Sequence, residues 1–138
     1  MLQVNTESIR LLRERTGAGI MDCKRALEDS GGDLDKAEEQ LKAAGIAKAA
    51  AKSHRATREG IIGSYVHAGG RIASMVEVNC ETDFVARTDV FKELAHNLAM
   101  QIAAMDPQFI DEDEMPEGDG RPPAEVCLLR QAFIKDPS

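Results

Sequence analysis

The sequence predicts an α+β fold, with three N-terminal helices followed by a small core of an antiparallel β-hairpin packed with helices. Up to about residue 45, apolar residues recur at the spacing of one helix face. From residue 60, apolar and polar residues alternate as in half-buried strands, and Gly69 and Gly70 separate two such runs like a hairpin turn. We therefore expect a three-helix domain at 1–45, a basic helical linker at 46–59 and an α+β core at 60–138.

The three N-terminal helices are predicted from apolar spacing and from residues that begin or end helices. Gly17 follows the first helix, the pair Gly31–Gly32 closes the second, and Asp33 is a suitable N-cap for the third. Short connections require the three helices to pack on one another. The residues expected to face their common core are Ile9, Leu12, Ile20, Cys23, Leu27, Leu34, Ala37 and Leu41.

A segment rich in alanine and basic residues joins the two predicted domains. It carries Lys42, Lys48, Lys52, Arg55 and Arg58, and no acidic residue appears before position 59. Its high helix propensity predicts an exposed helix. Two interpretations are open, a solvated linker or a basic strip at 42–58 that binds RNA or an acidic protein.

The second domain is predicted from a change in the spacing of apolar residues after residue 60, from helical spacing to alternation. In the second strand-like run, Ile72, Val76, Val78 and Cys80 alternate onto one face. A helix at 88–105 should cover that face, because its apolar residues recur at helical spacing before Pro107 stops it. These residues are Phe91, Leu94, Leu98, Ile102 and Met105. The acidic, Gly- and Pro-rich stretch at 106–124 is expected to be an exposed, mobile loop, followed by a short helix and an extended tail.

Composition and charge favour a soluble protein that does not specialise in nucleic-acid binding. The 138 residues carry a net charge of −7, and 14 of the 24 acidic residues but only 6 of the 17 basic ones lie in 60–138. No apolar run approaches the roughly 20 residues that a membrane span needs, and no signal peptide begins the chain. We expect a cytoplasmic protein, without membrane association or specific nucleic-acid binding. Its three cysteines are expected to be reduced and packed.

The sequence offers little support for an enzyme. A thiol nucleophile at Cys80 with His67 or His96 as its base is conceivable, but Cys80 falls on the inward face of a strand, where a thiol is usually inert. The histidines lack metal-ligand spacing, and the glycines match no phosphate- or dinucleotide-binding motif. We therefore expect neither catalysis nor a metal or cofactor.

The connection between the hairpin and the next helix contains an unexplained aromatic residue. Phe84 is one of 4 phenylalanines, and it lies in a polar stretch where no core-facing period requires it. Thr82 can cap a helical turn that starts there. Phe84 either folds back to seal the core or points outward beside Asp83 as an anchor for a partner.

Four segments resemble translation elongation factor Ts, the nucleotide-exchange factor of the GTPase elongation factor Tu. They are LRERTGAGIMDCKRAL at 12–27, AAAKSHRATREG at 49–60, VEVNCETDFVAR at 76–87 and LLRQAFIKDPS at 128–138. Their number and order make the resemblance specific over nearly the whole chain. The resemblance implies a ubiquitin-associated-like (UBA-like) three-helix domain and an α+β core of the dimerisation type.

The resemblance also implies a role for the turn. In the family, the Asp-Phe pair of a Thr-Asp-Phe-Val motif enters the GTPase near its nucleotide, disturbing the bound Mg²⁺ and the phosphate loop. That motif corresponds to Thr82, Asp83, Phe84 and Val85. We therefore expect Phe84 to be at least partly exposed, since the apolar alternation of the strand also ends before position 84. The N-terminal domain of the family grips the same GTPase, at positions that correspond to Arg13, Ile20 and Met21.

This chain departs from the family pattern in two ways. Long members carry two α/β halves, whereas this chain has one, and short members supply the second half by dimerising, so a homodimer is open. Members also continue past the FIKDPS segment with residues that complete the core, so the chain is expected to be a fragment or a truncated form. The rival interpretations are an RNA- or ribosome-associated protein, a ubiquitin-like-binding module and a thiol enzyme.

Overall fold

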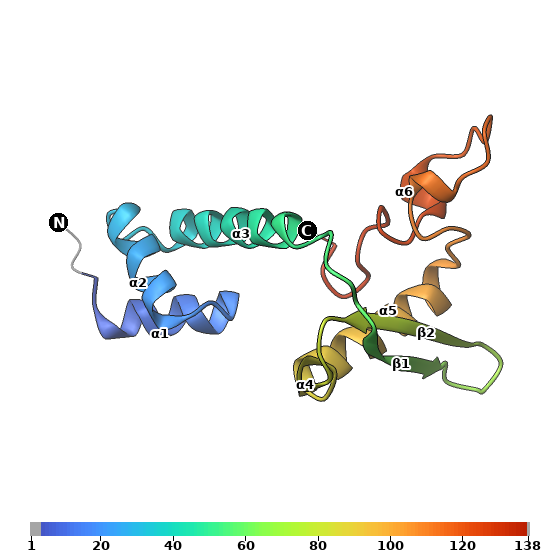
Figure 1. Ribbon diagram of the computed structural model, residues 1–138, viewed down its shortest axis with the longest axis horizontal. Helices are drawn as coiled ribbons and strands as arrows, with labels where there is room; N and C mark the ends of the chain where they lie inside the picture. Colours follow the sequence, from blue (N-terminus) through green and yellow to red (C-terminus); the bar gives the residue numbers. More distant parts are fainter. Residues whose placement is uncertain (1–3, 138) are drawn as a thin grey trace. The chain divides into compact units, whose positions relative to one another are not determined.

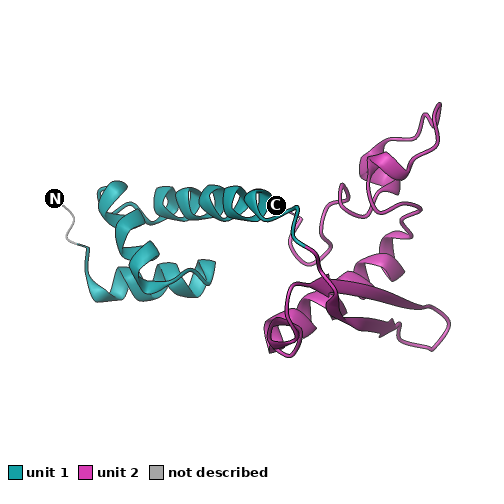
Figure 2. Ribbon diagram, viewed as in Figure 1, with its two compact units in different colours: residues 1–55 teal, residues 56–138 magenta. Residues whose placement is uncertain are grey.

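A computed structural model describes residues 4–137 and confirms the predicted α+β class. Its contacts divide the chain into two compact units, residues 1–55 and 56–138 (Figure 2). The first unit is helical, and the second holds the only two strands among the described residues, with helices beside them (Figure 1). No described helix has the length and hydropathy required to cross a membrane.

The first unit is built from the three expected helices around one core. They are α1 (Thr6–Thr16), α2 (Ile20–Asp29) and α3 (Leu34–Ala51). Gly17 has a φ of 67°, the left-handed conformation in which glycine ends helices without strain. Asp33 caps α3, as expected, because its carboxylate accepts hydrogen bonds from the N–H groups of Asp35 and Lys36. The fully buried members of the core are Leu12, Cys23, Leu27 and Ala37.

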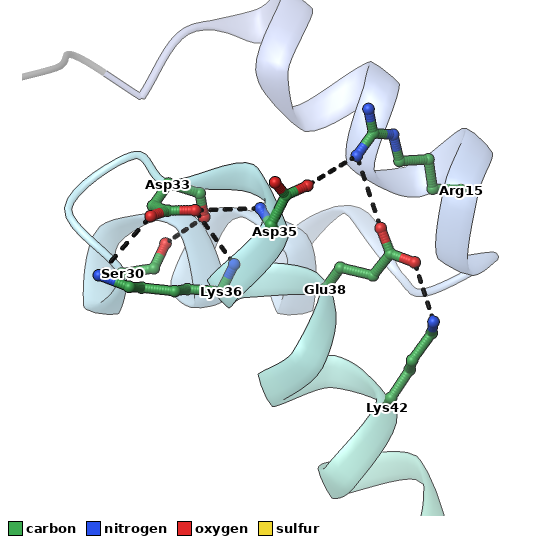
Figure 3. A network of polar contacts seen from close by, with 7 residues as sticks. All are labelled: Arg15, Ser30, Asp33, Asp35, Lys36, Glu38 and Lys42. Carbon is green, nitrogen blue, oxygen red and sulfur yellow. Dashed lines mark hydrogen bonds and ion pairs between the residues drawn. The ribbon is translucent and has the colours of Figure 1, made fainter. Parts of the chain in front are cut away.

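Ion pairs at the surface connect the end of α1 to the first turns of α3. Arg15 Nη1 lies 3.3 Å from Asp35 Oδ1 and 3.6 Å from Glu38 Oε2, and Lys42 Nζ lies 3.1 Å from Glu38 Oε1 (Figure 3). Beside them, the Ser30 hydroxyl donates to the Asp33 carbonyl at the entry to α3. This network joins the end of α1 to the start of α3, although surface ion pairs each contribute only about 0–1 kcal/mol.

The third helix continues well beyond the packed part of the unit. Leu41 is its last residue in contact with the core, yet the helix runs on to Ala51. Every residue from 42 to 59 is exposed. The first part of the expected linker is therefore the bare end of α3, which has the high helix propensity that an unsupported helix needs.

The second unit contains the expected hairpin. Strand β1 (Glu59–Val66) pairs antiparallel with β2 (Ala73–Cys80), with Glu59 opposite Cys80 and Val66 opposite Ala73. Val76, Val78 and Cys80 lie on the inward face, as predicted. The prediction for Ile72 was wrong, because this residue precedes the strand in the turn and is exposed.

Helix α5 (Asp89–Met105) covers the inner face of the hairpin, with a set of residues that matches the predicted one only in part. Its most buried apolar residues are Phe91, Ala95 and Ala99, whereas Leu94 and Met105 are exposed. A Cβ atom at Gly63 would lie only 2.6 Å from the Ala95 carbonyl carbon, so strand and helix meet almost backbone to backbone. The Ser74 hydroxyl likewise donates to the Ala99 carbonyl. Because the strand and the helix backbone are this close, only small side chains fit between them. The face of α5 that packs on the hairpin therefore does not include Leu94.

The acidic stretch is more structured than an unperiodic loop. It contains a 3₁₀ turn (Glu112–Glu114), and Arg130 Nε lies 2.8 Å from Asp111 Oδ1. Arg121 hydrogen-bonds to the Asp119 carboxylate and lowers the pKa of Asp119 to about 2. These pairs tie the loop to itself and to the segment that follows the short helix α6 (Pro123–Val126).

The tail after α6 is held along α5 by one buried polar side chain. Gln101 is nearly inaccessible, and its amide nitrogen donates to the Ala132 carbonyl over 3.1 Å. Its amide oxygen accepts from the Ile134 N–H over 2.9 Å. Both ends of this buried amide are thus satisfied, which fixes the tail against the helix.

We predict that Gly63→Ala destabilises the second unit, because the added methyl group collides with backbone atoms that cannot rotate away. Overpacking of this kind costs about 1–3 kcal/mol of unfolding free energy. Gly120→Ala, where the added atom meets nothing within 4 Å, is the matched control. Thermal melts should show a lower Tm for Gly63→Ala alone, and equal melts for both variants would contradict the close approach.

Candidate functional site

A four-residue helix, α4 (Asp83–Ala86), forms the connection between β2 and α5. It begins where expected, because the Thr82 hydroxyl accepts a hydrogen bond from the Val85 N–H over 3.4 Å. The turn is closed by backbone bonds from Ala86 to the Thr82 carbonyl and from Arg87 to the Asp83 carbonyl. The sequence therefore places Thr82, Asp83, Phe84 and Val85 on one compact turn.

The turn is anchored to the core by its last residue. Ala86 is buried and packs in a cluster with Cys80, at the end of β2, and Phe91, in the first turn of α5. The Cys80 thiol donates to the Thr82 carbonyl over 3.1 Å, which fixes the point where the strand becomes the turn. Cys80 is therefore an inaccessible structural thiol, as its inward position predicted.

Thr88 joins the turn to the following helix through two hydrogen bonds. Its hydroxyl donates to the Val85 carbonyl over 2.7 Å and accepts from the Phe91 N–H over 3.3 Å, so it also caps α5. The turn is thus held at its start by Thr82, at its base by Ala86 and at its end by Thr88. A connection held at three points presents its outer residues in a fixed direction.

The outer residues of the turn are apolar and exposed. Phe84 is 76% accessible to solvent, and Val85 beside it is also exposed. The interpretation that Phe84 folds back to seal the core is therefore wrong, and its predicted exposure is confirmed. Exposing an aromatic ring on a rigid turn forgoes the burial of a large apolar surface, an arrangement typical of partner-binding anchors.

The turn also carries one ion pair. Arg87 Nη2 lies 3.1 Å from Asp83 Oδ2, and both side chains are on the surface. The exposed end of the connection therefore presents an aromatic ring, a β-branched residue and a carboxylate that is paired with a guanidinium group. This set can bind a protein surface.

The three N-terminal candidate residues lie in the other compact unit. Arg13 is exposed near the end of α1, and Ile20 and Met21 begin α2 with 55% and 67% of their surfaces accessible. The prediction that Ile20 faces the helical core was wrong, because Ile20 is the first residue of α2 and is exposed, whereas Cys23 and Leu27 are buried as predicted. Two adjacent exposed apolar residues at a helix start form a second candidate contact surface.

Sequence reasoning overlooked Ala86, Arg87 and Thr88. A signal was available for Thr88, since a threonine directly before Asp89 and an apolar period is a typical N-cap. Ala86 gave no signal, because a lone alanine in a short connection has no period to reveal its burial.

Comparison with known proteins identifies the family. The family model described as elongation factor Ts matches residues 33–119. The elongation factor Ts of Syntrophomonas wolfei is 45% identical over 96% of this chain and 76% of its own length. Those of Thermotoga neapolitana and Anaeromyxobacter sp. are 57% and 58% identical over 84% of this chain, and the matches span 59% and 53% of their own lengths.

The chain belongs to the elongation factor Ts family, a family of translation elongation factors. It is short relative to these relatives. The matched range 33–119 includes the turn with Thr82, Asp83, Phe84 and Val85.

We predict that Thr88→Val loosens the turn, because valine keeps the shape of the side chain but removes both hydrogen bonds. Loss of the cap should cost about 1 kcal/mol of unfolding free energy, and the amides of residues 83–91 should exchange faster with solvent. Thr88→Ser keeps the hydroxyl and should behave like the wild type. Equal exchange rates in the two variants would show that Thr88 does not hold the turn.

Proposed function

We propose that this chain is a guanine nucleotide exchange factor that binds elongation factor Tu in its GDP-bound form and promotes GDP release. The observation that carries this proposal is the exposed ring of Phe84 on a turn anchored to the core. Membership of the elongation factor Ts family supports the choice of partner. Thr82, Asp83, Phe84 and Val85 are the residues that we assign to the contact near the nucleotide.

The proposed mechanism needs differential binding rather than chemistry. A factor that binds the nucleotide-free GTPase more tightly than the GDP-bound one weakens GDP binding by the same ratio. An apolar ring inserted near the Mg²⁺ and phosphate-binding groups creates such a difference, because it displaces the groups that hold them. We therefore propose a non-enzymatic factor without a cofactor of its own.

We further propose that the N-terminal unit supplies a second contact surface for the same GTPase. Arg13, Ile20 and Met21 are exposed, and the two apolar residues contribute nothing to the helical core. A second contact raises the affinity without adding to the disturbance at the nucleotide. In functional terms we divide the chain into a three-helix domain at 1–45, a linker at 46–59 and a core at 60–138.

A homodimer is also proposed, through the outer face of the hairpin. This face carries Ile62, Val66 and Met75, all exposed, and α5 covers only the opposite face. A two-stranded sheet that leaves large apolar residues exposed on one face is a marginal structure alone, and a second copy would cover them.

RNA binding through the basic strip at 42–58 is the second candidate function, and one observation favours it: the whole strip is exposed. Some of its cations are engaged, however, since Lys42 pairs with Glu38 at 3.1 Å and Lys48 with Asp22 at 3.8 Å. These ion pairs and the net negative charge of the chain both weaken the attraction to RNA phosphates. Nucleotide exchange is therefore the better supported function.

We predict that Phe84→Ala slows GDP release from elongation factor Tu while sparing the fold. A desolvated aromatic anchor contributes about 2 kcal/mol or more, which is roughly 30-fold in affinity. The melt should change little, because exposed substitutions usually stay within about 0.5 kcal/mol. The measurements are release of labelled GDP and a thermal melt of the same preparation.

Two controls accompany this experiment. Ile46→Ala removes another exposed apolar residue and should leave both GDP release and melting unchanged. Phe91→Ala removes a buried ring and should cost about 3–5 kcal/mol of stability. A Phe84→Ala variant that melts like Phe91→Ala, or that releases GDP at the wild-type rate, would contradict the proposed role.

We also predict weak RNA binding at physiological salt, with a Kd above about 1 μM and a steep loss as salt rises. Fluorescence anisotropy with a labelled single-stranded RNA measures this directly. A sub-micromolar Kd at that salt would reverse the order of the two candidate functions.

A further inference from the structure

Arg87 lies immediately after the exposed turn, and its side chain reaches back to Asp83. The distance between Arg87 Nη2 and Asp83 Oδ2 is 3.1 Å, and the side chains are 76% and 45% accessible. Resting on the proposed exchange function, we propose that Arg87 is a positioning residue. It fixes the Asp83 carboxylate beside Phe84 and remains its counter-ion when the GTPase covers the turn.

The pair contributes little to the fold of the free chain. An exposed ion pair between residues four apart on a helix is screened by water and is a minor term in stability. The turn is closed without the Arg87 side chain, because the backbone N–H of Arg87 donates to the Asp83 carbonyl over 3.1 Å. Ala86 and Thr88 anchor the base of the turn independently. Removing the guanidinium should therefore leave the turn in place.

The same pair becomes important once a partner excludes water from the turn. A carboxylate covered without a counter-ion carries its full desolvation cost, whereas a covered pair keeps its mutual attraction. Asp83 is directly adjacent to Phe84, so insertion of the ring brings the carboxylate to the protein interface. Arg87 therefore contributes to the stability of the complex and not to the stability of the free chain.

The first test compares Arg87→Gln with the wild-type chain in GDP release from elongation factor Tu. We expect Arg87→Gln to need at least about tenfold more factor for half-maximal release, with an unchanged Tm. Arg87→Lys should restore most of the loss, because it retains the charge. Lys92→Gln, which removes the same charge from an exposed position on α5, is the matched control and should stay within about twofold of the wild type.

A double-mutant cycle separates action through Asp83 from a direct contact with the partner. If Arg87 acts through the carboxylate, the variant with both Asp83→Asn and Arg87→Gln should be no slower than Asp83→Asn alone. The loss in Arg87→Gln should also persist between about 50 and 300 mM salt, because a covered pair is poorly screened.

Several results would overturn the inference. They are an Arg87→Gln variant that matches Lys92→Gln, losses that multiply in the double variant, a loss that disappears at high salt, or a Tm that falls with the activity. A wild-type chain that releases no GDP would overturn the proposed function together with this inference. Normal release by the wild type and by Arg87→Gln would overturn the inference alone.

Discussion

The near-contact between the hairpin and α5 is the constraint on which the second unit depends. Gly63 lies against the backbone of Ala95, and the Ser74 hydroxyl bonds to the Ala99 carbonyl. Where the strand approaches Ala95 this closely, only small residues fit on the helix, and Phe91 packs instead with Cys80 and Ala86. The near-contact also fixes where α5 begins relative to the end of β2, so the chain must cross between them in a short, tight connection.

That connection explains how an exposed aromatic residue acquires a fixed direction. With both ends set by the packed elements, Ala86 is drawn into the core and the residues before it are turned outward. The turn is thus anchored through Ala86 and its neighbours, while Phe84 remains exposed. A factor that inserts a side chain into its partner needs these two roles on different residues. The residues that perturb the partner must not be required for the factor's own folding.

Much of this arrangement was predictable from the sequence, for physical reasons that also explain the failures. Helix period, caps such as Asp33 and the Gly69–Gly70 turn are local signals, and they predicted the elements and the exposure of Phe84 correctly. The burial of Leu94 was mispredicted because the spacing of large apolar residues suggested it as core, whereas the close approach of Gly63 selects alanines. Ile20 failed for another reason, since periodicity identified the face of Cys23 and Leu27 correctly but cannot say how far along the helix the other helices cover it.

The central claim is that Phe84 is the residue buried in the partner, and fluorine NMR tests it most directly. The chain has only 4 phenylalanines, so fluorophenylalanine labelling gives a simple spectrum in which a Phe84→Leu variant assigns the resonance. On addition of GDP-bound elongation factor Tu, the Phe84 signal should shift and lose its H₂O/D₂O isotope shift, while the signal of buried Phe91 should stay in place. A bound complex in which the Phe84 signal keeps the isotope shift of an exposed ring would contradict the account.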